Sequence, residues 1–166
     1  MLTLAGSGSE QSRSLAVGRV TRPPTAAGHE LLTWDEYIPE GHLKPSSKLV
    51  DALTRHTSIL VIVPIYCGTP AAECLGAFQA LHEHETAMKQ LARKRLGMVG
   101  VSTGQSGREC LQPLASLSKS LGLWVDPGMM LLCDDMFIGP RLADPQALLE
   151  LDRLASRLRA LEGDAP

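Results

Sequence analysis

The sequence has few aromatic residues, no strong excess of charge of one sign and no long apolar run. Aromatic residues make up 4% of the 166 residues, which argues against a surface that stacks single-stranded nucleic acid. The formal net charge is -2, without a dominant basic block, so no nucleic acid or anionic membrane is expected as a partner. No apolar run reaches the length of a membrane span, and the start MLTLAGSGSE does not resemble a secretory signal. We therefore expect a cytoplasmic protein.

Cysteine is sparse, and its spacing excludes common metal and redox motifs. The four cysteines, with no CxxC pair, are Cys67, Cys74, Cys110 and Cys133. In a chain of this size they indicate reduced thiols. A nucleophilic Cys67 would need a nearby base, and no histidine is close in sequence. We interpret Cys67 as a loop residue that faces a ligand, with inert packing as the main alternative, and the other three as small buried hydrophobic residues.

Two clusters of titratable residues invite a metal interpretation, but no metal site is expected. The segment His82-Glu-His-Glu85 has the residue types of a zinc motif. On a helix, however, His82 and His84 point to different faces, and Thr86 stands where HExxH requires its final histidine. A solvated helix face explains the segment better. Asp134-Asp135 is interpreted as a turn and cap rather than a cation site.

Apolar runs alternate with helical patterns about five times along the chain, whose 44% hydrophobic and 20% charged residues are ordinary for a globular protein. Strands are expected at residues 2–5, 29–34, 59–63 and 98–102, followed by strand pieces at 124–125 and 129–132. Helices are expected at residues 12–20, from 46 or 47 onward, at 73–93, at 108–121 and after Asp144-Pro145. This order predicts a three-layer α/β sandwich with a parallel sheet, in one domain over residues 1–166 with a frayed tail at 163–166.

In such a sheet, ligands bind beyond the carboxyl ends of the strands, so the loops that follow the strands are the candidate sites. Loop 1, residues 6–14 (GSGSEQSRS), combines hydroxyls and a guanidinium at the start of a helix, which suits a phosphate. It contains neither GK[ST] nor GxGxxG, which disfavours ATP and dinucleotides. The alternative is a flexible Gly/Ser turn without a ligand. Loop 2 is residues 64–70 (PIYCGTP) and loop 3 is residues 102–107 (STGQSG).

The order of these motifs resembles that of the NADPH-dependent FMN reductase family of flavodoxin-like flavoproteins. LAGSGSEQSRS is similar to that family's strand and phosphate loop, VPIYCGTP to its Pro-x-Tyr-Asn-Gly-Ser loop, and VSTGQSG to its Ser-x-Gly-Gly loop. The segment DDMFIGPRLADPQALLELDRL resembles the family's C-terminal loop and helix. The resemblance covers essentially the whole chain. It implies a flavodoxin-like fold with a five-stranded parallel sheet.

The resemblance also implies a set of cofactor-binding residues. Loop 1 would hold the FMN phosphate through Ser7, Ser12, Ser14 and Arg13. Loop 2 would contact the ribityl chain and the flavin ring through Pro64, Tyr66, Cys67 and Gly68. Loop 3 would flank the isoalloxazine through Ser102, Thr103, Gly104 and Gln105. No catalytic acid or base is expected, because the cofactor carries the chemistry of hydride transfer.

The activity that the resemblance implies is hydride transfer from NAD(P)H to FMN, by a flavin reductase or a quinone-type oxidoreductase. The expected assembly is a homodimer or homotetramer, and a monooxygenase is a plausible partner. Several departures from the family's pattern matter. Ser9 stands where arginine is common, and Cys67 where asparagine is common. The helix start after loop 2 is altered to Pro70-Ala-Ala-Glu-Cys-Leu75, and the segment between loop 1 and the second strand is short. They motivate an alternative, a flavodoxin-like binding or regulatory protein that has lost tight FMN binding and reductase activity. An electron-transfer flavoprotein is less favoured, because the chain lacks an acidic excess.

Overall fold

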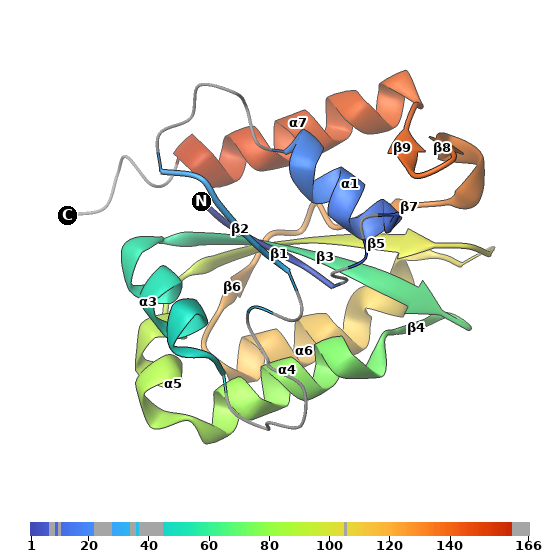
Figure 1. Ribbon diagram of the computed structural model, residues 1–166. Helices are drawn as coiled ribbons and strands as arrows, with labels where there is room; N and C mark the ends of the chain where they lie inside the picture. Colours follow the sequence, from blue (N-terminus) through green and yellow to red (C-terminus); the bar gives the residue numbers. More distant parts are fainter. Residues whose placement is uncertain are drawn as a thin grey trace.

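The computed structural model describes residues 1–6, 9, 11–21, 28–33, 36, 45–104 and 106–160. At its centre lies a parallel sheet with the strand order β2-β1-β3-β5-β6 (Figure 1). The strand β7 also pairs with β5, closer to the carboxyl end of β5 than β6 does. The parallel strands are β1 (Leu2–Ala5), β2 (Glu30–Thr33), β3 (Ser58–Tyr66), β5 (Arg95–Ser102), β6 (Trp124–Val125) and β7 (Met130–Leu132). Since β6 and β7 lie along the same edge of β5, they act as one interrupted fifth strand.

Helices cover both faces of the sheet and give the expected three layers (Figure 1). On one face lie α1 (Arg13–Val20) and α7 (Pro145–Ala160), and on the other lie α3 (Ser47–Arg55), α4 (Ala72–Glu83), α5 (Glu85–Leu91) and α6 (Gln112–Ser120). The buried apolar side chains form two hydrophobic clusters, one on each face of the sheet. In β3, Leu60 and Ile62 join the α1–α7 side, whereas Val61 and Val63 join the other side. Alternation along a strand therefore places one apolar run in both cores.

Two helix boundaries differ from those expected. The single helix expected at residues 73–93 is wrong, because the chain leaves the helix at His84 and starts α5. The His84 ring accepts a hydrogen bond from the backbone N–H of Ala87 at 3.3 Å and so caps α5. His82 is exposed and His84 half-buried. The helix expected at 108–121 begins as a 3-10 turn, η1 (Arg108–Leu111), and Pro113 occupies the first turn of α6, where its missing N–H costs nothing.

The strand expected at residues 59–63 continues to Tyr66, through Pro64. The pairing of β1 with β3 ends at Ala5 and Ile62, so the missing N–H of Pro64 breaks no bond to β1. The Pro64 carbonyl accepts a hydrogen bond from the backbone N–H of Ala71 at 2.9 Å. The extra length of β3 carries the chain beyond the end of β1.

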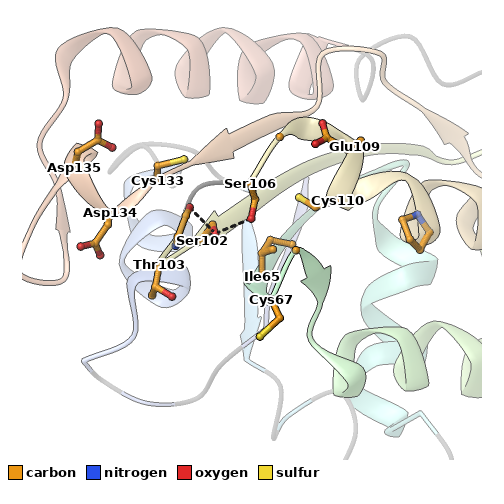
Figure 2. Close-up of a pocket in the computed structure, with 14 residues that line it drawn as sticks. Ile65, Cys67, Ser102, Thr103, Ser106, Glu109, Cys110, Cys133, Asp134 and Asp135 are labelled. Atoms are coloured by element: carbon orange, nitrogen blue, oxygen red, sulfur yellow. Dashed lines mark hydrogen bonds between the residues drawn. The ribbon is translucent and has the colours of Figure 1, made fainter.

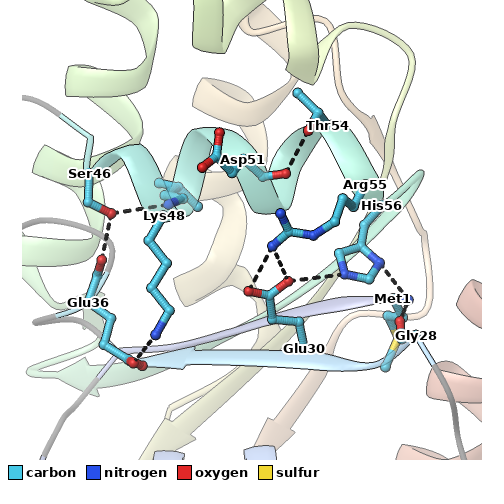
Figure 3. A network of polar contacts seen from close by, with 11 residues as sticks. Met1, Gly28, Glu30, Glu36, Ser46, Lys48, Asp51, Thr54, Arg55 and His56 are labelled. Carbon is cyan, nitrogen blue, oxygen red and sulfur yellow. Dashed lines mark hydrogen bonds and ion pairs between the residues drawn. The ribbon is translucent and has the colours of Figure 1, made fainter.

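Polar contacts attach α3 to the edge strand β2 (Figure 3). Arg55 at the end of α3 pairs with Glu30 at 2.8 Å, and the buried His56 ring lies 3.5 Å from the same carboxylate. The other ring nitrogen of His56, Nδ1, lies 3.1 Å from the amino nitrogen of Met1. The Arg55 pair is largely solvated and adds little stability. These contacts chiefly set the position of α3 against the sheet.

The start of α3 is held by a second group of contacts, around Glu36 (Figure 3). The Ser46 hydroxyl accepts from Leu49 N–H at 3.1 Å, so of the two expected starts, Ser46 or Ser47, Ser46 is the cap. The same hydroxyl donates to the Glu36 carbonyl at 2.6 Å. Burial raises the pKa of the Glu36 carboxyl, but hydrogen bonds from Lys48 and Thr33 outweigh burial and leave the pKa below its ordinary value.

Within the described residues, no helix combines the length and apolar composition needed to cross a bilayer.

Candidate functional site

A pocket of about 1170 Å³ lies at the carboxyl ends of β3 and β5 (Figure 2). This volume exceeds the range of roughly 300–1,000 Å³ typical of sites for drug-sized ligands. The residues that line it are Ile65, Cys67, Gly68, Ser102, Thr103, Gly104, Ser106, Gly107, Glu109, Cys110, Pro113, Cys133, Asp134 and Asp135. Three segments far apart in sequence therefore meet here: the end of β3, the loop after β5, and the segment after β7.

The first wall is a hairpin rather than the long loop expected at residues 64–70. β4 (Thr69–Pro70) pairs antiparallel with the end of β3, so that expectation is wrong, and Cys67-Gly68 alone forms the tip. Both tip residues have positive φ, 50° for Cys67 and 75° for Gly68. A two-residue hairpin turn with this geometry matches the right-handed twist of its strands. The hairpin projects the exposed Cys67 into the pocket lining.

The second wall is the loop after β5, which Ser102 folds into a tight turn. Ser102 is 2% exposed, and its hydroxyl contacts both the carbonyl oxygen of Gly104, at 3.1 Å, and the backbone N–H of Gly104, at 3.2 Å. The Ser102 hydroxyl also lies 3.4 Å from the Ser106 hydroxyl, to which it can donate. The Ser102 side chain thus supplies hydrogen bonds that secondary structure would otherwise provide to this loop. In this turn, Thr103 and Gly104 stay exposed at the pocket.

The third wall was not expected to be part of the site. Glu109, Cys110 and Pro113 come from η1 and α6, and Cys133 and the Asp134-Asp135 pair follow β7 (Figure 2). The aspartates do form the expected turn, a 3-10 turn at Asp134–Met136 (η2). The sequence contained a signal for them, because they follow the expected fifth strand, whose carboxyl end lies at the same edge of the sheet.

Two of the pocket thiols are held in the neutral form. Burial raises the pKa of the Cys110 thiol, and the nearby charge of Glu109 raises it further. Burial and then the charge of Asp135 raise the pKa of Cys133 in the same way. The thiolate is the nucleophilic form, so both residues are poor nucleophiles at neutral pH. The expected burial of Cys74 and Cys110 is confirmed, whereas Cys133 is only half-buried and lines the pocket.

Loop 1 lies beside the pocket without lining it, as far as the structure describes it. Arg13 forms a salt bridge with Asp134, donates to the Gly139 carbonyl at 3.2 Å, and lies 5.0 Å from the centre of the Phe137 ring. Phe137 belongs to a second hairpin, β8 (Phe137–Ile138) and β9 (Arg141–Leu142). Arg13 thus connects the start of α1 to the segment that forms the third wall. The serines beside it are also engaged: Ser12 caps α1 through Leu15 N–H at 3.4 Å, and Ser14 is 3% exposed.

Gly6 fixes the beginning of loop 1 against β3. Its N–H donates to the Ile62 carbonyl at 2.8 Å. A Cβ at this position would lie 2.5 Å from Cδ of Pro64 and 2.8 Å from Sγ of Cys74. These distances are below van der Waals contact, so only glycine fits here without displacing its neighbours. The packing brings loop 1 to the base of the β3–β4 hairpin.

The structure thus separates the residues that the resemblance implies into two groups. Cys67, Gly68, Ser102, Thr103 and Gly104 line the pocket. Five others lie outside its lining: Ser12, Arg13, Ser14, Pro64, which is buried in β3, and Tyr66, which is exposed. Ser7 and Gln105 lie outside the described residues. The FMN-binding roles of all these residues stay predictions.

Comparisons with known proteins identify similar structures but no similar sequences. Neither the family models nor the curated proteins gave a match. Among solved structures, an oxidoreductase from Corynebacterium diphtheriae superposes with a TM-score of 0.71 at 16% identity, over 99% of this chain and 97% of that one. An NADH:FMN oxidoreductase in its apo form superposes with a TM-score of 0.72 at 15% identity, over 99% of this chain and 90% of that one. A WrbA-like flavodoxin from Agrobacterium tumefaciens superposes with a TM-score of 0.63 at 21% identity, over 96% of this chain and 95% of that one.

These likenesses extend over nearly the whole of each chain, at identities that establish fold alone. They agree with the strand order found here, in which β1 lies between β2 and β3 and the later strands follow on the far side. That order is the flavodoxin-like one, with its ligand crevice where β1 and β3 diverge. The fold that the resemblance implied is therefore confirmed: this chain is an α/β protein with a flavodoxin-like fold.

Proposed function

We propose that the protein is an NAD(P)H-dependent FMN reductase, or a closely related quinone-type flavin oxidoreductase. The observation that carries the proposal is the convergence of loops 2 and 3 on one pocket. These are the two segments whose sequences resemble the ring-contacting loops of the FMN reductase family, and both contribute residues to its lining. Two structures similar to this chain are named as flavin-dependent oxidoreductases, which supports the same assignment.

The pocket residues suit a flat ring system. A Cβ at Gly68 or at Gly104 would meet no atom within 4 Å, so the backbone at both positions is open to a ligand. Close approach of backbone to a ring favours glycine at such places. The hydroxyl of Thr103 and the backbone amides of loop 3 can hydrogen bond to the polar edge of a flavin. Bound there, FMN would accept a hydride from the nicotinamide and pass the electrons to an acceptor.

The chain's own contribution would be binding, orientation and exclusion of water. The hairpin tip and loop 3 would hold the ring between them. The start of α1 would take the phosphate, because free N–H groups and the helix dipole favour an anion there. Arg13, the first residue of α1, places a cation at that helix start. To contact a phosphate it must share its guanidinium with Asp134 or leave it.

The setting we propose is a cytoplasmic homodimer or homotetramer that delivers its product to a monooxygenase or reduces a quinone directly. The nicotinamide co-substrate would approach the exposed side of the ring. No protein acid or base is needed for hydride transfer, which is compatible with a pocket lined by neutral thiols, hydroxyls and solvated carboxylates.

The test is the visible spectrum of the purified protein with and without added FMN, combined with the rate of NAD(P)H oxidation. We expect a protein-bound flavin band and oxidation that depends on FMN. Absence of both binding and oxidation would contradict the proposal. Binding of FMN without oxidation would favour the alternative of a binding or regulatory protein. A Cys67→Ala variant should retain full reductase activity, since no step requires a thiolate.

A further inference from the structure

Among the residues that the structure describes, the pocket lining carries negative charge and no positive charge. Its carboxylates are Glu109 on one side and Asp134 and Asp135 on the other (Figure 2). Of the described residues that line it, none is lysine, arginine or histidine. Arg13 neutralises part of this charge through its salt bridge with Asp134, but Glu109 and Asp135 have no salt-bridge partner among the described residues.

Glu109 borders loop 3. Its carboxylate lies against Gly107, so closely that a Cβ at Gly107 would overlap its oxygens. The carboxylate therefore lies beside loop 3, where the proposed ring contacts are. Asp135 belongs to η2, which is attached to the start of α1 through Asp134 and Arg13. Both side chains are exposed.

The negative field acts on groups that belong to the pocket itself. The charge of Glu109 adds to burial in raising the pKa of Cys110, and the charge of Asp135 does the same for Cys133. These thiols lie on different elements, η1 and the end of β7, and both line the pocket. A reactant that enters the pocket would meet the same field.

We propose that Glu109 and Asp135 select the electron acceptor by charge, so that neutral or cationic aromatic acceptors react and anionic ones are disfavoured. The inference rests on the proposed function and names the acceptor class that the sequence leaves open. For a quinone the overall reaction is NAD(P)H plus a proton plus quinone, giving NAD(P)⁺ and hydroquinone. Two electrons pass to the quinone, and its two oxygens each gain a proton, one from the donor's hydride equivalent and one from solvent.

The effect should be moderate and sensitive to salt. A solvated charge several ångströms from a ligand changes its relative affinity by about twofold to tenfold, and the Debye length at physiological ionic strength is about 8 Å. We therefore expect the preference for a neutral over an anionic acceptor to decrease as salt is raised. Both carboxylates should contribute, because they lie on opposite sides of the pocket.

The experiment compares menadione, which is neutral, with naphthoquinone sulfonate, which is anionic. The ratio of their kcat/KM values is measured at saturating FMN for the unchanged protein, Glu109→Gln, Asp135→Asn and the double variant. The ratio of the two dissociation constants is measured in parallel by calorimetry on FMN-free protein. Glu85→Gln is the matched control, since Glu85 is an exposed carboxylate on α5, outside the pocket lining.

We expect the double variant to shift both ratios toward the sulfonate by roughly fivefold or more at low salt, and Glu85→Gln to leave them unchanged. Equal ratios in the double variant and the unchanged protein would overturn the inference, as would an equal shift in Glu85→Gln. Failure to bind either quinone would also overturn it. If FMN neither binds nor supports oxidation, the proposed function fails, while the calorimetric ratio still decides whether the carboxylates discriminate by charge.

Discussion

Loop 1 and the pair of loops 2 and 3 follow strands at the same edge of the sheet, yet their polar groups are used differently. In loop 1, Arg13 is paired with Asp134, Ser12 caps α1, and Ser14 is buried. At the pocket, the hairpin tip and Thr103-Gly104 are exposed. The difference predicts that loop 1 can bind a ligand only by sharing or exchanging contacts that its side chains already make, whereas the loops at the pocket are open to one.

The largest expected effect probes the charge of Arg13 in loop 1. Arg13→Ala should weaken FMN binding by about 1.5–3 kcal/mol, the usual contribution of a hydrogen bond to a charged group, and leave riboflavin, which lacks the phosphate, nearly unaffected. Asp134→Asn should tighten FMN binding, because it releases Arg13 from its salt bridge. Fluorescence titration of both flavins measures the difference. Equal losses for FMN and riboflavin in Arg13→Ala would place the phosphate elsewhere.

A second prediction concerns the attachment of loop 1 to β3. Gly6→Ala should destabilise the protein by about 1–3 kcal/mol, because the added Cβ overlaps Pro64 and Cys74. The matched control is Gly104→Ala in loop 3, where a Cβ meets nothing within 4 Å, and the expected change is within about 0.5 kcal/mol. Urea unfolding gives both values. Similar free energies of unfolding for the two variants would show that loop 1 relaxes easily.

The third prediction tests the conformation of the hairpin tip. Gly68→Ala should cost about 1 kcal/mol, because φ is +75° there and an L-residue is strained in that region. Gly76→Ala in α4 should instead stabilise by about 0.5–1 kcal/mol, since that position is helical with open space around it. In thermal unfolding, Gly68→Ala should lower Tm and Gly76→Ala should raise it. A stabilising Gly68→Ala would contradict the turn geometry.

A smaller stabilisation is expected from Cys67→Asn. The φ of +50° at Cys67 suits asparagine better than most residues, and Asn-Gly is the preferred tip of a two-residue hairpin turn. The gain in unfolding free energy should be a few tenths of a kcal/mol, detectable as a small rise in Tm. Replacement by valine is the control and should destabilise, because β-branched residues avoid positive φ. A loss of stability in Cys67→Asn would mean that the thiol makes a specific contact.

The smallest effect concerns the thiols on the third wall. Burial and then Asp135 raise the pKa of Cys133, so its thiolate, and hence its alkylation, should become appreciable only at a pH above the ordinary range for cysteine. Asp135→Asn removes the charge that adds to burial at Cys133 and should move the alkylation profile of Cys133 toward lower pH. The profile of Cys110 should move less, because Asp135 is not among the charges that raise the pKa of Cys110. Iodoacetamide labelling followed by peptide mass spectrometry measures each profile. An unmoved Cys133 profile would show that burial alone controls this thiol.

The expected elements were largely found, but their ends depended on contacts between distant segments. The start of α3 was predicted at residue 46 or 47 and the start of α7 after Asp144-Pro145. The observed caps Ser46 and Asp144 agree, because each capping contact is made within a few residues. The break at His84 and the extension of β3 through Pro64 were not readable. The first interrupts an otherwise continuous helical pattern, and the second depends on where β1 ends.

The local pattern of residues determined the three-layer architecture, the parallel sheet and the location of two pocket loops. Apolar periodicity and capping are short-range signals, and they settle which segments form strands and helices. Only the tertiary structure decided that Arg13 is paired with Asp134 and that Glu109 reaches the same pocket as the aspartates. These residues are far apart in the chain, and their proximity arises from the order of strands in the sheet. The charge of the site is therefore a property of the fold rather than of any one motif.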